Sequence, residues 1–425
     1  MRVVRRALPM LAALLVGGFA MMLAPSGSFT PLWLPIALAV GALAWVLFQP
    51  LDAQRDDLLP ALAALLTCLG LTEIARLSPL LAHKQLWWCA IALAVVLVLS
   101  PMLTNFRRMA SYKYIWVLAS LILFVLLVVV GHEVNGARLW IAIGPLHLEP
   151  VEFIKLFIVF FLAAYLAEMG DVIADAKPWS LRANAKYLGP LFLGWGASTA
   201  ILIVQRDLGM AALLLATFAT MLYAATRRID IVLGGLAIFG VAALWALHRY
   251  TYVQTRVGVW LHPFAHPLGR GYQAAQSYYS LAAGGLLGTG YRLGHPGFIP
   301  DVATDYIYAA FSEEFGLIGA IVILALYVAL VRRILVAGLE RPDLYAKLLA
   351  VGLSATLGFQ VAIIVGGVIG LFPLTGITLP FVSYGGSSLV ANVVLIALAW
   401  SLSARPRRVA PARVAPPSGD EAPSL

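Results

Sequence analysis

The run YIWVLASLILFVLLVVVG, residues 114–131, is eighteen residues long and carries no charged side chain. A helix that crosses a lipid bilayer needs about 17 to 25 predominantly apolar residues. This run therefore predicts a membrane-spanning helix that begins near Ile115. Similar runs begin near Leu8, Leu32, Leu58, Leu86, Val151, Tyr187, Leu208, Ile231, Leu317, Leu348 and Ser387. We expect about twelve spans in an all-α, polytopic integral membrane helix bundle.

The composition favours the same class of protein. Of the 425 residues, 62% are hydrophobic and only 12% are charged, about half the usual charge of a soluble domain. Cys68 and Cys89 both lie inside apolar runs, so the sequence suggests neither a disulfide framework nor a cysteine-rich metal site. The net charge of +9 lies in short clusters between apolar runs, which membrane orientation explains better than nucleic-acid binding.

The basic residues also predict the orientation of the chain. With a cytoplasmic N-terminus, one side of the membrane holds roughly twenty Lys and Arg residues and the other about nine. Because positive residues favour the cytoplasmic side, we expect both termini to be cytoplasmic. The start of the chain has the regions of a signal peptide, but its positive end fits a retained first span. The cytoplasmic clusters are Arg107, Arg108, Lys113, Lys177, Arg182, Lys186, Arg227, Arg228, Arg332, Arg333 and the arginines at 405–408.

These spans divide the chain into three parts. Residues 1–131 form the N-terminal transmembrane helices, and residues 132–403 form the main membrane core. Within the core, a long extracytoplasmic loop covers residues 248–312. Residues 404–425 are rich in Pro, Ala and Arg, so we expect a disordered cytoplasmic tail. Chemistry is therefore expected in the bundle and its outer loops.

The segment NGARLWIAIG, residues 135–144, precedes Glu149 and the next predicted span. Glu152 and Lys155 follow three residues apart and so share one face of that helix. Charges at this depth are costly unless they are paired or face a wet cavity. They indicate either a structural ion pair or a lysine that faces an anionic substrate.

Two shorter outer turns carry polar groups. In QRDLG, residues 205–209, Asp207 is suited to cap the helix that follows. In PLTGITLPFVSYGGSSL, residues 373–389, prolines and glycines predict irregular backbone, which is tolerated at membrane depth only where protein buries it or it lines a cavity. Ser387 and Ser388 are suited to cap the last helix, whose N-terminal amides could also receive an anion.

The long outer loop contains HPFAHPLGRGYQAAQS, residues 262–277, and TDYIYAAFSEE, residues 304–314. Its Arg256, Arg270 and Arg292 suit a phosphate-bearing lipid headgroup, or they form an ordinary solvated face. Glu313 and Glu314 are expected to open the next helix, where acidic residues favour the helix dipole. A zinc site at the loop histidines is not favoured, because no HxxxH pair lies on an evident helix.

In this order, NGARLWIAIG with EPVEFIK, QRDLG, HPLGRGYQAAQS, TDYIYAAFSEEFGLIG and GLFPLTGITLPFVSYGGSSL resemble the SEDS family of shape, elongation, division and sporulation proteins, typified by RodA and FtsW. The resemblance covers residues 135–402 and implies a SEDS-like core preceded by about two extra N-terminal helices. It further implies a peptidoglycan glycosyltransferase that polymerises lipid II outside the cytoplasmic membrane, in complex with a class B penicillin-binding protein.

Such an inverting displacement needs a base for the attacking sugar hydroxyl and positive charge for the departing lipid diphosphate. A divalent cation can share the second task. The family carries a loop aspartate held to be essential, but this sequence has His266 there, which we take as the candidate base. The candidate substrate-binding residues, all but Arg270 from matches to the family pattern, are Arg138, Glu152, Lys155, Asp207, Arg270, Tyr272, Gln273, Gln276, Ser277, Asp305, Glu314, Ser387 and Ser388.

Two other functions remain open at this stage. The missing aspartate is compatible with a catalytically silent member that acts as a scaffold or regulator of a penicillin-binding protein. The intramembrane Lys155 and the broken backbone near Gly385 are compatible with a transporter of lipid-linked precursors.

Overall fold

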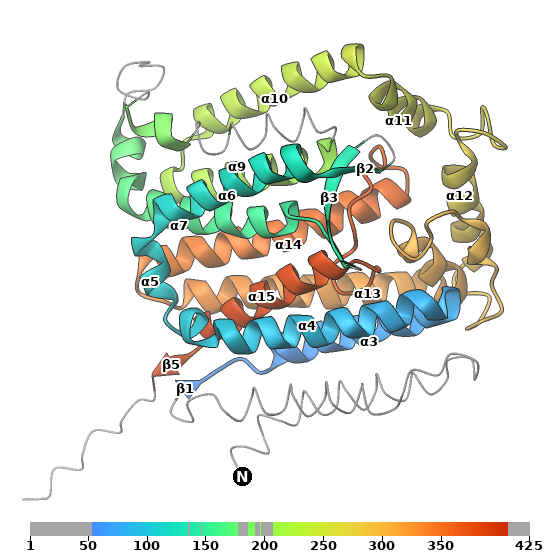
Figure 1. Ribbon diagram of the computed structural model, residues 1–425, viewed down its shortest axis with the longest axis horizontal. Helices are drawn as coiled ribbons and strands as arrows, with labels where there is room; N and C mark the ends of the chain where they lie inside the picture. Colours follow the sequence, from blue (N-terminus) through green and yellow to red (C-terminus); the bar gives the residue numbers. More distant parts are fainter. Residues whose placement is uncertain are drawn as a thin grey trace, which may run out of the picture.

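The computed structural model describes residues 53–134, 137–144, 146–176, 186–191, 196 and 207–406, and Figure 1 shows a bundle of roughly aligned helices. Within this part of the chain, eight helices are long and apolar enough to cross a membrane. This is a multi-pass membrane protein. The eight are α3 (Leu58–Leu77), α4 (Pro79–Thr104), α6 (Lys113–Val130), α7 (Val151–Asp175), α9 (Leu208–Thr226), α10 (Ile229–Arg249), α13 (Ile307–Leu339) and α14 (Leu344–Val368).

The apolar helix α15 (Gly386–Leu402) corresponds to the last predicted span, and the short helix α5 (Phe106–Ser111) joins α4 to α6. Of the predicted spans, those near Leu8 and Leu32 lie outside the described residues, as does most of the one near Tyr187. The mainly helical architecture confirms the expected fold class, and the spans that can be compared lie close to the predicted apolar runs.

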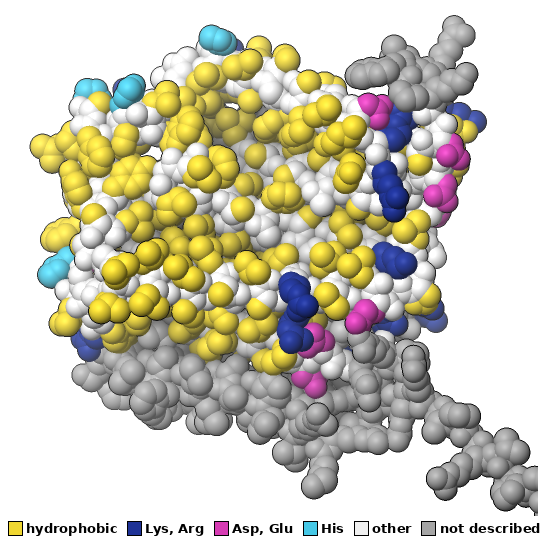
Figure 2. Space-filling view, turned by 180° about the vertical axis from the view of Figure 1, so that it is seen from behind, with side chains coloured by type: hydrophobic (Ala, Val, Ile, Leu, Met, Phe, Trp, Pro, Cys, Tyr) yellow, Lys and Arg dark blue, Asp and Glu magenta, His cyan; other side chains and the backbone are white. Residues whose placement is uncertain are grey.

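The core is built around α14, which packs against α7, α9 and α13 (Figure 1). On another side of the bundle, α15 packs against α4 and α3. In contrast, α6 and α10 expose large apolar residues such as Val129 and Val241, at 74% and 68%. Figure 2 shows a hydrophobic surface between the two ends of the bundle. Lipid can cover that surface without any polar group losing its hydrogen bonds.

Two small antiparallel sheets add to the helices. One has three strands, β2 (His132–Val134), β3 (Ala137–Ile143) and β4 (Leu146–Leu148), in the order β2-β3-β4. It is formed by the outer segment that the sequence analysis treated as a loop. The other pairs β1 (Ala53–Gln54) with β5 (Arg405–Pro406), which joins the start of the described chain to its end.

The long loop also contains helices. It includes α11 (Thr251–Leu261), α12 (Tyr272–Gly284) and the 3-10 helix η1 (Pro296–Phe298), all at the end of the bundle opposite α5 (Figure 1). The sequence analysis did not predict these helices, because their apolar residues are too few to form a span.

Helix α13 begins at Ile307, ten residues before the predicted Leu317, and breaks at Gly316 with a φ of +67°. The segment before it supplies the missing hydrogen bonds. The amides of Leu317 and Ile318 donate to the carbonyls of Gly285 and Leu286, at 2.9 and 3.2 Å. A Cβ on Gly288 would lie 2.0 Å from the Glu314 carbonyl, so only glycine permits this approach. Hydrogen bonds to Gly285 and Leu286 of the long loop therefore replace those that the helix loses at the break.

Residues 371–385 contain neither helix nor strand, as the proline and glycine pattern predicts. Protein buries much of this segment. Tyr384 N donates to the Ala303 carbonyl at 2.8 Å, and the Ser383 hydroxyl donates to the Thr304 carbonyl at 2.5 Å. The irregular segment is thus fixed beside residues 303–305, the last residues of the outer loop before α13.

Candidate functional site

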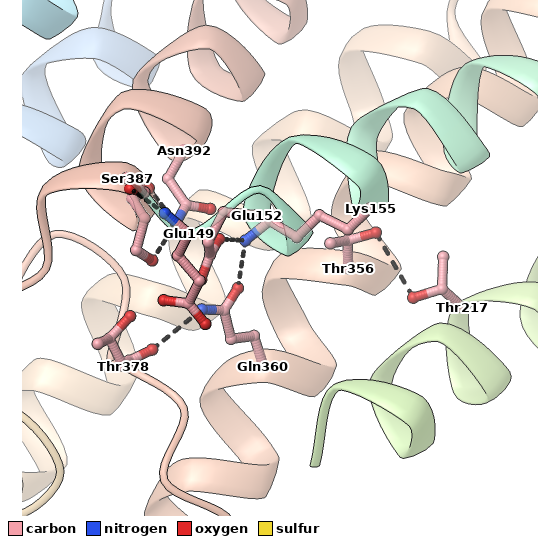
Figure 3. Close-up of polar contacts among 10 residues, drawn as sticks. Glu149, Glu152, Lys155, Thr217, Thr356, Gln360, Thr378, Ser387 and Asn392 are labelled. Carbon is pink, nitrogen blue, oxygen red and sulfur yellow. Dashed lines mark hydrogen bonds and ion pairs between the residues drawn. The ribbon is translucent and has the colours of Figure 1, made fainter. Parts of the chain in front are cut away.

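A buried polar network, shown in Figure 3, centres on Lys155 of α7, whose side chain is completely inaccessible. Its ammonium forms an ion pair with Glu152 and donates to Gln360 Oε1 of α14 at 2.7 Å. The amide Nε2 of Gln360 donates in turn to the carbonyl of Thr378 at 3.0 Å. An isolated charge would be very costly here, so these contacts make the lysine tolerable.

The network continues to the start of α15. The backbone amide of Glu149 donates to the Ser387 hydroxyl at 2.9 Å, and Asn392 Nδ2 donates to the carbonyl of Ser388 at 2.8 Å. Neither serine caps α15, since the N-cap is Gly385 and no side-chain capping bond forms there. Ser387 instead connects the N-terminus of α15 to the segment that leads into α7, whereas the contact of Ser388 stays within α15. Burial raises the pKa of Glu149, and the charges of Glu152, Asp207 and Asp305 raise it further.

Asp207 caps α9, because its carboxylate accepts a hydrogen bond from Met210 N at 3.0 Å. Burial raises its pKa to about 6, although the Met210 bond and the charge of Arg256 act in the opposite direction. A Cβ on the neighbouring Gly209 would lie 2.5 Å from Thr375 Cβ, so the turn packs directly on the irregular segment. Asp207 therefore lies between the buried network and the outer loop.

A cavity of about 210 Å³ lies under the outer loop, and we call it the Asp305 cavity. Four of the predicted site residues line it together: Arg270, Gln273, Ser277 and Asp305. Gln273 Nε2 donates to the Pro300 carbonyl at 2.9 Å, which fixes the loop beside the cavity. Burial raises the pKa of Asp305 to about 6, and the nearby charge of Asp301 adds to this effect.

A second cavity of about 310 Å³, the His266 cavity, is lined by His262, His266 and Arg270 together with residues of α11. Thr255, Val259 and Arg270 line both cavities, so the two adjoin. The imidazole of His266 is exposed, and its hydrogen bonds in the described structure are made by its carbonyl, which accepts from Gly269 N and Gly271 N.

Arg256 of α11 is exposed and lines the Asp305 cavity. Its Nη1 donates to the carbonyls of Leu374 and Thr375, at 3.1 and 2.8 Å. Through these bonds it holds the irregular segment, and its charge lowers the pKa of both Asp207 and Asp305. The prediction of site residues did not include it.

Glu314 lies away from both cavities. Its carboxylate pairs with Arg76 Nε of α3 at 2.5 Å and accepts from Arg292 N at 2.8 Å. The neighbouring Glu313 accepts from His295 N at 2.6 Å, and Arg76 Nη2 donates to the Gly294 carbonyl at 2.7 Å. These buried contacts fix the segment before η1 onto α3 and α13.

The remaining candidates lie elsewhere. The backbone of Arg138 belongs to β3, Tyr272 opens α12, and Gln276 follows one turn later without lining either cavity. In the described ranges, no group of three or more His, Cys, Asp or Glu side chains is arranged to hold a metal ion.

Gln360 and Asn392 were also missed by the sequence analysis. Each is a single polar residue inside an apolar span, and such residues usually face the interior of a bundle. That signal could have identified both. Nothing in the sequence could have indicated that the carbonyl of Thr378 completes the network, since every residue carries a carbonyl.

Comparisons with known proteins agree with this architecture. The family model of the cell cycle proteins FtsW, RodA and SpoVE matches residues 61–408. The chain is 38% identical over 380 residues to the peptidoglycan glycosyltransferase RodA of Mycobacterium tuberculosis, covering 85% of this chain and 81% of that protein. It is 37% identical over 287 residues to the stage V sporulation protein E of Bacillus subtilis, covering 67% and 76%.

Two solved structures are also similar. One, described as the structural coordination of polymerization and crosslinking by a peptidoglycan synthase complex, aligns with a TM-score of 0.66 and 31% identity over 82% of this chain and 97% of that one. The other, the rod shape determining protein RodA of Thermus thermophilus, aligns with a TM-score of 0.59 and 28% identity over 82% and 96%. This chain therefore belongs to the FtsW, RodA and SpoVE family, the SEDS family whose motifs it carries.

Proposed function

We propose that this protein is a peptidoglycan glycosyltransferase that polymerises lipid II at the outer face of the cytoplasmic membrane, in cell division or cell-shape control. The observation that carries the proposal is the pair of adjoining cavities under the outer loop. They bring the cations Arg256 and Arg270 together with the proton acceptors Asp305 and His266, which are the groups that a glycosyl transfer from a lipid diphosphate needs. The names of the mycobacterial relatives support the same activity.

The orientation follows from the distribution of charge. In Figure 2 most of the visible Lys and Arg side chains lie at one end of the bundle, and histidines lie at the other. Arg107, Lys113 and Arg228 belong to the basic end, at the ends of helices opposite α12. By the positive-inside rule, this distribution supports the proposal that the basic end and both termini are cytoplasmic and that the cavities open outside.

A class B penicillin-binding protein is the proposed partner. The support is the similarity to a chain from a peptidoglycan synthase complex that coordinates polymerization and crosslinking. The outer loop and the outer-facing helices are the candidate contact surface.

The test is polymerisation of lipid II by the purified protein together with its penicillin-binding partner, read out as glycan chains on a gel. The natural chain should make polymer. His266→Ala and His266→Asp are measured beside it, because the sequence assigns the base to His266. If His266 is the base, the alanine variant loses synthesis and the aspartate variant keeps it.

If the natural chain makes no glycan polymer in this assay, the proposal is contradicted. Activity gained only by His266→Asp would then identify a scaffold that has lost its base, the alternative that the sequence left open. A transporter would instead move lipid II across reconstituted vesicles, and no such movement is expected from this chain.

A further inference from the structure

Asp305 has a defined position that His266 lacks. Its carboxylate and the guanidinium of Arg256 both approach Gly376: a Cβ built there would lie 3.6 Å from Asp305 Oδ2 and 3.5 Å from Arg256 Nη2. Gly376 has a φ of +79° and no side chain, so the space between the two charges stays open. In the described part of the chain, the two side chains form no ion pair. The carboxylate is therefore available to a ligand in the cavity.

The surroundings of Asp305 suit a base that works near neutral pH. Burial and the charge of Asp301 raise its pKa to about 6, while a hydrogen bond with Thr304 and the charge of Arg256 act against this. A base is most efficient when its pKa lies near the working pH. The titratable and charged groups around it are Asp301, Arg256, Arg270, Tyr278, Tyr306, Glu149 and Asp207.

The position of His266 is less well defined. Its ring is exposed in the neighbouring cavity, and among the described residues no side chain or backbone group is hydrogen-bonded to the ring. A base must lie within about 2.6 to 3.2 Å of the proton that it removes, which requires a fixed orientation. The ring of His266 has no such constraint in this structure.

The same cavity has room for the leaving group. Arg256 is held by two carbonyls through Nη1, and its Nη2 is directed toward the open space at Gly376. Arg270 adds a second guanidinium, and the fully buried Ser277 hydroxyl has no hydrogen-bond partner in the described chain. Trp260, Phe372 and Leu374 provide an apolar wall. This combination suits a diphosphate attached to a prenyl chain.

We propose that Asp305 is the proton acceptor of the transfer reaction and that Arg256 positions the diphosphate. The carboxylate takes the proton of the attacking sugar hydroxyl, and the hydroxyl oxygen bonds to the anomeric carbon of the lipid-linked glycan. The bond from that carbon to the diphosphate oxygen breaks, and its electron pair leaves with the diphosphate. No other reactant is needed. This inference rests on the proposed function and makes His266 dispensable as a base.

The experiment measures lipid II polymerisation and lipid II binding by the same purified complex. Asp305→Asn should lower the turnover rate by about 100-fold or more while binding stays within about threefold, because a general base typically contributes 10²- to 10⁴-fold. Asp305→Glu should retain part of the rate, because it keeps a carboxylate at this position. In the natural chain, kcat/KM should rise with pH through about 6.

Asp301→Asn provides a test that does not depend on the folding of the Asp305 variants. Removing that negative charge should lower the pKa of Asp305, so the acidic limb of kcat/KM should move to lower pH. An active Asp305→Asn variant, or a limb that Asp301→Asn does not move, would overturn the inference and leave the polymerase function intact. A natural chain that binds lipid II without polymerising it would instead overturn both.

Discussion

The buried network and the two outer cavities contain the same kinds of side chain, but these differ in exposure and in hydrogen bonding. In the network, Lys155 and Glu152 are each at most 2% exposed, and the lysine is bonded to both Glu152 and Gln360. In the cavities, Arg256, Arg270 and His266 are exposed. Within the described ranges, Arg256 is the one of these three whose side chain is hydrogen-bonded to protein, through Nη1 of its guanidinium. In the buried network the charged side chains bind one another. In the cavities they are available to bind a ligand.

The physical reason for this difference is solvation. A charge inside a bundle must be paired, because neither lipid nor packed protein replaces the water that it loses. A charge at the outer end keeps its water and can exchange it for a substrate. We therefore expect substitutions in the network to act on stability first, and those in the cavities to act on activity first.

The largest expected effect is that of Lys155→Met. This change leaves the Glu152 carboxylate buried without its cation, and breaking a buried pair typically costs about 3 to 5 kcal/mol. The free energy of unfolding, or the midpoint of thermal unfolding in detergent, should fall accordingly.

The matched control is the double variant Glu152→Gln with Lys155→Met, which removes both charges. Replacing a whole buried pair is often neutral, so most of the lost stability should return. Recovered stability with recovered polymerisation would indicate a structural ion pair. Recovered stability without polymerisation would show that Lys155 faces the substrate.

A smaller effect on the free energy of unfolding is expected from the titration of Asp207, which lies between the buried network and the cavities. Its pKa is raised from 3.8 to about 6 in the folded protein, so the folded state binds the proton more tightly than the unfolded state. The contribution of Asp207 to the free energy of unfolding should be most favourable below about pH 4 and should decrease as pH rises to about 6. The loss is on the order of 3 kcal/mol, from about two pKa units.

Asp207→Asn tests this directly, since asparagine caps a helix about as well as aspartate but does not titrate. The variant should lose the part of the fall between pH 4 and pH 6 that comes from Asp207, and it should be more stable than the natural chain at pH 7. Asp305, whose pKa is also raised to about 6, should still contribute a fall of its own. The measurement is unfolding in detergent across this pH range. An unchanged pH dependence would show that Asp207 keeps its charge at little cost.

The smallest effect on stability is expected for Arg270→Ala. Because Arg270 is exposed and lines both cavities, its loss should change the free energy of unfolding by less than about 0.5 kcal/mol. Polymerisation should nevertheless fall clearly, since we propose that Arg270 faces the diphosphate of the substrate. Arg107→Ala, at an exposed ion pair with Asp343 at the opposite end, is the control for a surface arginine.

The boundaries of α13 show where prediction from sequence reaches its limit. The apolar pattern indicates a span from Leu317, but the helix begins at Ile307 and continues across Gly316. At the break, the segment 284–290 replaces hydrogen bonds that the helix loses, since Leu317 N and Ile318 N donate to the carbonyls of Gly285 and Leu286. Such a contact joins parts of the chain about thirty residues apart, so no local pattern contains it.

The candidate site also shows that sequence motifs do not reveal which residues lie together. The motifs identified Arg270, Gln273, Ser277 and Asp305, which the structure brings together in one cavity. They also identified Glu314, which the structure holds against Arg76 at a distance from that cavity. Arg256 was seen as a basic residue of the loop, but its hydrogen bonds to Leu374 and Thr375 depend on a segment more than a hundred residues away.

The sequence by itself determined the class of fold, the approximate positions of the spans that can be compared and the polar residues that its motifs singled out, because apolar length and charge placement are local properties of the chain. The tertiary structure alone decided which of those polar residues are paired and which are available. That choice depends on burial, and burial is set by helices that meet only after folding. It is the reason why Lys155 is held by Glu152 and Gln360 while Asp305 faces an open cavity.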